Sequence, residues 1–482
     1  MRKRLFTVSV AVAGMAGFAG TAAGEATVKL NPTGFVSYNI GEVVHADPIS
    51  ATHANIGMPV IDAAFLQRII AGFNVQASYD PLPITTNVGL ELKVYNQIPR
   101  EDATWMDLGL SQRIFYLPYI TRADFVYSPS EAFNLDVGYF PFKYNDDARN
   151  LGEYLFRSGT YPQYLITNFD FAAARVAGVR ANGVVFNNLH YDALLTSNFE
   201  YSTIGDLNFT AITSYSFLDK FIGLSGGFSL CSFISADKKH TRPKINTEEA
   251  DMYIDDNSDS IYVPFSGPFA GDTLHYSNYT FAGTKLMGRI AVDPKKLFSD
   301  ELGGIFGKED LKIYGEAAVL GVNNYPGSIA GSYVKPDSIN RPDDSVFVSL
   351  TRYDDILKRM PVMFGFNIPT FKLLDVLSME WEWFGSPYPN DMEMIYMDGI
   401  PVTQKSYKSG SISTYEDSTN DNWKWSFYAK KTLAGHFHVV FQMASDHFRW
   451  DWAAYDKQAQ LQNQALTKRW HKWWVLKLGY SF

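Results

Sequence analysis

Short segments of alternating hydrophobicity recur along almost the whole chain, and no other feature of the sequence constrains the fold as strongly. Apolar and polar residues alternate in each segment with the period of two that is typical of a β-strand with two unlike faces. The sequence contains no run of about 18 or more apolar residues that would predict a transmembrane helix. We predict sixteen strands, at 33–43, 68–79, 85–97, 113–127, 133–144, 175–187, 189–199, 207–217, 222–236, 275–293, 311–324, 359–371, 375–386, 423–433, 437–450 and 472–482.

The connections between these strands alternate in length. Numbered along the chain, the even ones are mostly short and the odd ones mostly long, apart from the seventh (200–206) and the tenth (294–310). An antiparallel membrane barrel has this arrangement, with short turns in the periplasm and long loops outside the cell. The tenth connection begins with Asp293 and Pro294, which can start a helix, and Gly303 can end it. We interpret it as a short periplasmic helix; a further strand pair there would raise the count to eighteen and break the alternation.

The two ends of the sequence indicate export and insertion. Residues 1–24 have the basic start, short apolar core and small terminal residues of a cleavable signal peptide. The segment 472–482 (KWWVLKLGYSF) resembles the closing strand of bacterial outer-membrane β-barrels, in which a terminal Phe is the assembly signal. The residues that carry this resemblance share one parity: Trp474, Leu476, Leu478, Tyr480 and Phe482.

Composition favours one membrane barrel over several soluble domains. Residues 25–482 are long for a single soluble domain, but no linker or change in composition divides them. Aromatic residues make up 15% of the chain, which fits the aromatic girdles of a membrane barrel. The single cysteine, Cys231, excludes an internal disulfide. The formal net charge of −9 argues against nucleic-acid binding and weakly favours cations in a pore.

Charged residues on the polar parity of the strands are expected to face a wet lumen. A charge on the lipid face near the middle of the bilayer costs about 2–4 kcal/mol. Glu380 and Glu382 lie one predicted strand away from Lys424, so they either pair across strands or form a charged channel wall that sets ion preference. The predicted lumen-lining residues are Glu91, Lys93, Arg122, Asp124, Arg180, Glu380, Glu382 and Lys424.

The third predicted outer loop, 145–174, is long and carries both signs of charge. Its place after the fifth strand resembles that of the loop that folds into the lumen of sixteen-stranded general porins and narrows it. The resemblance covers the topology of the whole mature chain, and no porin sequence motif accompanies it. It implies a constriction loop, although an exposed cap over the barrel mouth is the alternative. The candidate constriction residues are Asp146, Asp147, Arg149, Glu153 and Arg157.

These features predict a porin-like channel in the outer membrane of a Gram-negative-type bacterium. Ions and small polar solutes would diffuse passively through the wet lumen, without a cofactor, a catalytic site or a metal. The expected partners are outer-membrane lipid, lipopolysaccharide and the barrel-assembly machinery, and analogy with general porins implies a homotrimer. Three alternatives are a surface-binding or adhesin-type barrel acting through its outer loops, an outer-membrane enzyme with its site at the rim, and a soluble secreted β-protein with its apolar faces buried between two sheets.

Overall fold

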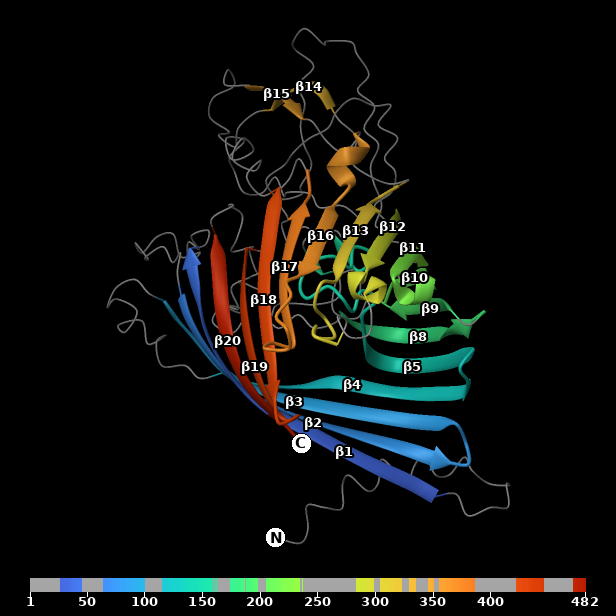
Figure 1. Cartoon of the computed structure of the whole chain (residues 1–482). Helices are drawn as coiled ribbons and strands as arrows, with labels where there is room; N and C mark the ends of the chain where they lie inside the picture. Colours follow the sequence, from blue (N-terminus) through green and yellow to red (C-terminus); the bar gives the residue numbers. More distant parts are fainter. Residues whose placement is uncertain are drawn as a thin grey trace.

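The wall of the molecule is a closed antiparallel β-barrel of sixteen strands (Figure 1). The computed structural model describes residues 27–45, 64–99, 115–158, 161–162, 174–186, 188–197, 205–234, 236, 283–298, 304–322, 329–334, 346–350, 355–385, 422–445 and 471–482. The barrel strands, in spatial order, are β1 (Thr27–His45), β2 (Ala64–Asp80), β3 (Ile84–Pro99), β4 (Phe115–Ser130), β5 (Phe133–Phe142), β8 (Ala174–Val185), β9 (Leu189–Ser197), β10 (Leu207–Phe217), β11 (Ile222–Ile234), β12 (Gly283–Val292), β13 (Ile313–Val319), β16 (Val362–Asn367), β17 (Val376–Trp383), β18 (Trp423–Leu433), β19 (Phe437–Ser445) and β20 (Lys472–Ser481).

The first and last strands close the barrel by pairing with each other. β1 runs antiparallel to β20, with Val36 opposite Tyr480 and Ile40 opposite Leu476. At the end of this seam, the backbone amide of Phe482 donates to the carbonyl of Gly34 at 2.9 Å. Every predicted strand overlaps one barrel strand, so the all-β fold class and the count of sixteen are confirmed.

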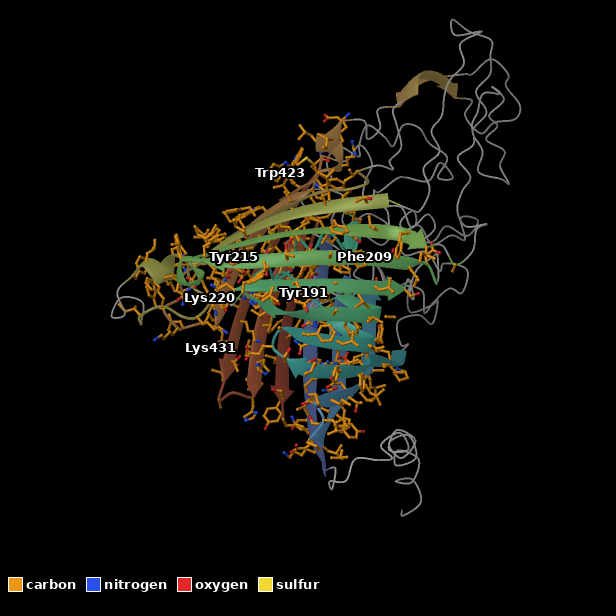
Figure 2. The ribbon with its side chains drawn as sticks, turned by 90° about the vertical axis from the view of Figure 1, so that its right-hand side faces the viewer. Tyr191, Phe209, Tyr215, Lys220, Trp423 and Lys431 are labelled. Atoms are coloured by element: carbon orange, nitrogen blue, oxygen red, sulfur yellow. The ribbon has the colours of Figure 1, made fainter. Side chains whose placement is uncertain are left out.

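The two faces of the wall differ as the alternation predicts. On β17 the side chains of Ser378, Glu380 and Glu382 are buried towards the lumen, while the residues between them are partly exposed on the outside. Figure 2 shows Tyr191, Phe209 and Tyr215 along the wall, with Lys220 and Lys431 near one end and Trp423 near the other. Exposed large apolar side chains recur on the outer faces of the strands, among them Ile69, Phe73, Val88, Leu90, Leu92, Leu286, Ile290 and Phe364. This apolar outer surface has the character of a lipid-facing one.

All described short connections lie at one end of the barrel, which we call the short-turn rim. They are residues 81–83, 131–132, 186–188, 218–221, 293–312, 368–375 and 434–436. In the connection 293–312, the 3₁₀-helix η3 (Pro294–Leu297) is capped by Asp293, whose carboxylate accepts from the amide of Lys295. The predicted short helix is therefore confirmed at its start, and no additional barrel strand pair occurs among the described residues of this connection.

Smaller elements lie outside the barrel sheet. β14 (Ile329–Val334) pairs with β15 (Val346–Leu350), and β6 (Arg157–Ser158) pairs with β7 (Tyr161–Pro162). Two more 3₁₀-helices are η2 (Leu218–Lys220) and η4 (Ile356–Arg359). Among the described residues, no helix has both the length and the apolar character needed to cross a membrane. The predicted signal peptide, residues 1–24, lies outside the described residues.

Candidate functional site

The connection after β5 folds into the barrel, and its residues 143–156 are here called the inner loop. Leu151, Tyr154, Leu155 and Phe156 are almost fully buried in one apolar cluster. The wall contributes to the same cluster from several strands, with Val176, Leu194, Ile212, Met287, Tyr314, Ala318 and Met363. The outer faces of these strands carry exposed apolar residues, so the cluster lies on the lumen side. The inner loop thus packs against the lumen side of β8, β9, β10, β12, β13, β16 and β17 and fills that part of the lumen.

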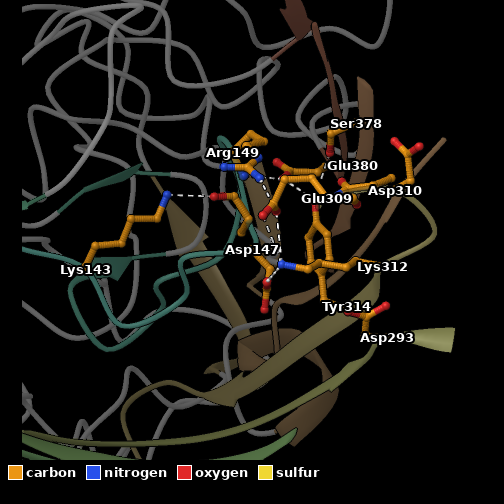
Figure 3. Close-up of polar contacts among 12 residues, drawn as sticks. Lys143, Asp147, Arg149, Asp293, Glu309, Asp310, Lys312, Tyr314, Ser378 and Glu380 are labelled. Carbon is orange, nitrogen blue, oxygen red and sulfur yellow. Dashed lines mark hydrogen bonds and ion pairs between the residues drawn. The ribbon is translucent and has the colours of Figure 1, made fainter. Parts of the chain in front are cut away.

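One buried carboxylate on the wall holds the inner loop by its backbone. Glu380 on β17 accepts hydrogen bonds from the amides of Arg149, Asn150 and Leu151; the last two are both 2.9 Å long. The Tyr314 hydroxyl donates to the same carboxylate at 2.7 Å (Figure 3). Four donors therefore converge on one side chain that is 1% exposed. A buried polar group with this many partners fixes the backbone that supplies them.

A glycine allows Tyr314 to reach this carboxylate across the sheet. Tyr314 on β13 pairs with Gly365 on β16, and Gly365 pairs in turn with Glu380 on β17. A Cβ atom at Gly365 would lie 2.3 Å from Cε2 of Tyr314, so a larger residue would occupy the space of the ring. The missing side chain is what lets one strand's tyrosine reach over its neighbour to the next strand.

A second wall carboxylate, Glu316 on β13, holds both ends of the buried turn. Its Oε1 accepts from the Tyr144 hydroxyl at 2.6 Å and from the Tyr154 amide at 3.0 Å. Its Oε2 accepts from the Asn145 side-chain amide at 3.1 Å. Burial, and next the nearby charge of Glu316, raise the pKa of the Tyr144 hydroxyl well above its ordinary value. This hydroxyl therefore stays protonated and remains a donor at physiological pH.

Glu382 and Lys424 lie directly opposite each other on β17 and β18. Both side chains are 1% exposed, and the Tyr154 hydroxyl donates to Glu382 at 2.9 Å. The sequence left open whether Glu380 and Glu382 pair across strands or form a charged channel wall. The structure shows a third role, since both glutamates contact the inner loop and neither is open to solvent.

The charged residues predicted for the constriction have different environments. Asp146 is exposed, whereas Glu153 is buried and has a positive φ of 63°. Asp147 pairs with Arg289 at 2.8 Å and Arg149 pairs with Glu309 at 2.8 Å. Burial alone would raise the pKa of Asp147, but the nearby cations Arg289 and Lys312 outweigh it and hold the pKa below its ordinary value. The fifth candidate, Arg157, lies in β6 with its side chain outside the described part of the molecule.

The wall formed by β4, β5, β8 and β9 carries charges beside solvent-accessible space. Arg122 contacts Asp124 at 2.7 Å, and Arg180 bridges Asp136 at 3.2 Å and Asp192 at 2.6 Å. The arginine side chains are 33% and 26% exposed, whereas those of their three acidic partners are 0%, 13% and 19% exposed. Because this face of the sheet points inwards, the described residues leave solvent-accessible space beside these two arginines, whose side chains are more exposed than those of their acidic partners.

Tyr119 on β4 organises the neighbouring part of this wall. Its hydroxyl donates to Glu91, and its ring lies 4.8 Å from Lys93 Nζ and 5.0 Å from the guanidinium carbon of Arg175. A cation over an aromatic face is held in place by the ring quadrupole. The predicted lumen residues Glu91 and Lys93 therefore lie in one ordered cluster, on the same side of the lumen as Arg122 and Arg180.

Sequence reasoning missed several residues that hold the inner loop. Glu316 is a charged residue in the middle of the predicted strand 311–324, so the cost of a charge on the lipid face indicates that it points inwards. Tyr314 gives no such signal, because a tyrosine suits either face of a membrane strand. Glu309 lies in a connection, where alternation carries no information about direction. Lys312 is the second residue of the predicted strand 311–324 and has the parity of Glu316, although the structure begins β13 one residue later.

The closing strand shows the predicted division of its faces. Leu478, Tyr480 and Phe482 are exposed on the outer surface, while Trp473 and Val475 are buried. Beside it, the ring nitrogens of His438 contact the hydroxyls of Ser481 at 2.9 Å and Thr432 at 3.1 Å. The third group of this trio is thus a hydroxyl, not the carboxylate that orients histidine in hydrolytic triads. No cluster of three or more His, Cys, Asp or Glu residues suited to a metal occurs in the described regions.

No protein-family model and no curated protein matches the chain. Solved structures with similar folds include a porin variant from Rhodopseudomonas blastica, with 8% identity and a TM-score of 0.40 over 94% of this chain and 100% of that one. Others are the anion-selective porin from Comamonas acidovorans (7%, 0.40, 95% and 100%) and the outer membrane channel DcaP of Acinetobacter baumannii (10%, 0.39, 94% and 97%). The chain is a closed, sixteen-stranded antiparallel β-barrel. That description rests on its own strand pairing, because likeness at these values assigns no function.

Proposed function

We propose that this protein is an outer-membrane channel for the passive diffusion of small polar solutes and ions. The observation that carries the proposal is the asymmetry of the lumen. The inner loop packs against one part of the wall, from Val176 on β8 round to β17, whereas the side chains of Arg122 on β4 and Arg180 on β8 keep solvent-exposed surface inside the barrel. A barrel of this strand number holds an aqueous channel unless something fills it, and here the described filling covers one side.

The charged wall favours anions in this proposal. The side chains of Arg122 and Arg180 are more exposed than those of the acidic residues that pair with them. A permeating ion close to this wall therefore experiences a positive surface. This differs from the cation preference that the net charge indicates, because net charge counts buried carboxylates such as Glu380 and Glu382 equally with groups that meet the solvent.

The same proposal places the apolar outer surface in the outer membrane and the short-turn rim in the periplasm. Residues 1–24 act as the cleaved signal peptide, and the outward-facing aromatic end of β20 engages the barrel-assembly machinery. Lipopolysaccharide and phospholipid surround the barrel, and a homotrimer is the proposed assembly. Support comes from the apolar outer faces, the exposed Tyr480 and Phe482, and the grouping of short turns at one end.

Liposome swelling with neutral sugars tests passive diffusion directly. Refolded protein is inserted into liposomes, which are diluted into isotonic sugars of increasing size. We expect swelling that slows as the sugar grows, and faster swelling with larger sugars when residues 145–152 are removed from the inner loop. Absence of swelling, from protein shown to be folded by its heat-modifiable gel mobility, would refute a diffusion channel. That result would favour the surface-binding alternative, in which the outer loops act and the lumen is blocked.

A further inference from the structure

The connection 293–312 belongs to the short-turn rim, yet two of its side chains reach the inner loop, which enters the barrel from the opposite end. We propose that Glu309 and Lys312 are positioning residues, through which this rim connection holds the charged turn of the inner loop in place. The inference goes beyond the proposed diffusion channel by assigning control of the loop to the short-turn rim. It needs the barrel and its inner loop, and its first test needs no ion flow.

The contacts form a chain of alternating charge. Arg289 on β12 pairs with Asp147 at 2.8 Å, and Asp147 meets Lys312 at 3.4 Å. Lys312 then pairs with Glu309 at 3.1 Å, and Glu309 pairs with Arg149 at 2.8 Å (Figure 3). Both ends of the turn around Ala148 are thereby tied to residues outside the loop. In this chain the three inner charges, Asp147, Lys312 and Glu309, each have two oppositely charged neighbours, which restricts the turn more than isolated surface pairs do.

The rim connection is itself anchored, so it can serve as a fixed support. Asp310 is fully buried, and its carboxylate accepts from the Gly307 amide at 2.8 Å, the Phe371 amide at 3.0 Å and the Thr370 hydroxyl at 3.1 Å. These bonds join the connection to the neighbouring turn between β16 and β17. The side-chain amide of Asn367 also donates to the backbone carbonyl of Glu309 at 2.9 Å.

Aromatic contacts reinforce this anchor. The ring of Phe306 lies 5.7 Å from that of Phe298 and 5.5 Å from that of Phe371, between centroids. These three rings join η3, the following turn and the β16–β17 turn. Glu309 and Lys312 therefore extend from a braced segment, and a movement of the inner loop must first break their ion pairs.

The hydrogen bonds of Glu380 to the loop backbone, here called the Glu380 clamp, and the rim ion pairs hold different groups of the same turn. Glu380 binds the backbone of residues 149–151, whereas the rim binds the side chains of Asp147 and Arg149. The backbone bonds to Glu380 do not hold these side chains, and apart from the rim Asp147 has its ion pair with Arg289 on β12. The rim pairs fix their direction, and so fix where the loop presents its charge.

A nitroxide on the exposed loop residue tests this positioning without any channel measurement. The label is attached at Asp146→Cys in a Cys231→Ser background, and its mobility is compared with and without Glu309→Gln. We expect the mobile fraction of the label to rise about two- to five-fold, the range for a partly exposed ion pair. The matched control is Lys296→Gln, an exposed residue of the same connection, which should leave the spectrum unchanged.

A double-mutant cycle separates direct pairing from general loosening of the rim. If Glu309 acts through Arg149, then Glu309→Gln adds little to the mobility already gained in Arg149→Gln. Additive effects of the two substitutions, or a Glu309→Gln spectrum identical to that of the unsubstituted protein, would overturn the proposal. A silent channel with the expected spectra would refute the diffusion function and leave the positioning role standing.

Discussion

Replacing Glu380 with Gln should release the inner loop while leaving the barrel intact. The side-chain NH₂ group of the introduced Gln would take the position that Oε1 of Glu380 has now. There it can donate to the Tyr314 hydroxyl, which can in turn donate to the hydroxyl of Ser378, 2.8 Å away. The amide of Arg149 would lose its acceptor, while those of Asn150 and Leu151 keep theirs. One orphaned buried donor costs about 1–3 kcal/mol. This cost corresponds to an increase of about 5- to 150-fold in the population of undocked loop.

Hydrogen exchange measures this population directly. Amides of the segment 143–156 should exchange about 5- to 150-fold faster in Glu380→Gln, whereas those of the barrel strands keep their protection. Asp192→Asn is the matched control, since it removes a lumen-facing carboxylate that pairs with Arg180 on the opposite wall. Exchange of the loop within about two-fold of the unsubstituted protein in Glu380→Gln, or equal acceleration in Asp192→Asn, would refute the claim that Glu380 holds the inner loop.

Three further predictions concern the same lumen. The pKa of Asp147 is lowered below 3.8, so its ion pairs are complete above about pH 4 and are lost only as the pH falls through the lowered value. Hydrogen exchange of the inner loop, corrected for intrinsic rates, should therefore not change between about pH 8 and pH 5. Faster exchange at the lower end of that range would contradict this prediction. Arg180→Gln should shift the reversal potential towards cations, and an unchanged potential would remove its role in selectivity. Gly365→Ala should displace Tyr314 and destabilise the loop by about 1–3 kcal/mol, seen as faster loop exchange, while protection equal to that of the parent would show that the ring adapts.

Much of the fold follows from local physics that the sequence displays. On β17 the letters LSMEWEW, from Leu377 to Trp383, alternate strictly, and the structure reproduces that alternation as inner and outer faces. The short turns were recognisable because antiparallel neighbours need few residues to connect. The tenth connection was the difficult case, and Asp293 followed by Pro294 correctly indicated the start of a short helix.

The arrangement inside the lumen could not be predicted in this way. Alternation shows that Glu380 faces inwards, but not that its partners are backbone amides more than 200 positions earlier in the chain. The crossing of Tyr314 over Gly365 depends on the register of three strands, which one sequence does not specify. The net charge carries no information about burial, which decides the charges that a solute in the lumen meets.

Single-channel recording in a planar bilayer with asymmetric KCl tests the central claim most directly. The proposed channel predicts steady, stepwise openings and a reversal potential displaced towards chloride, a displacement that Arg180→Gln reduces. Silence from protein with the heat-modifiable gel mobility of a folded barrel would contradict an open lumen. Stepwise openings with a cation preference that Arg180→Gln leaves unchanged would still show a channel. They would refute the proposal that the arginines of the charged wall set its ion selectivity.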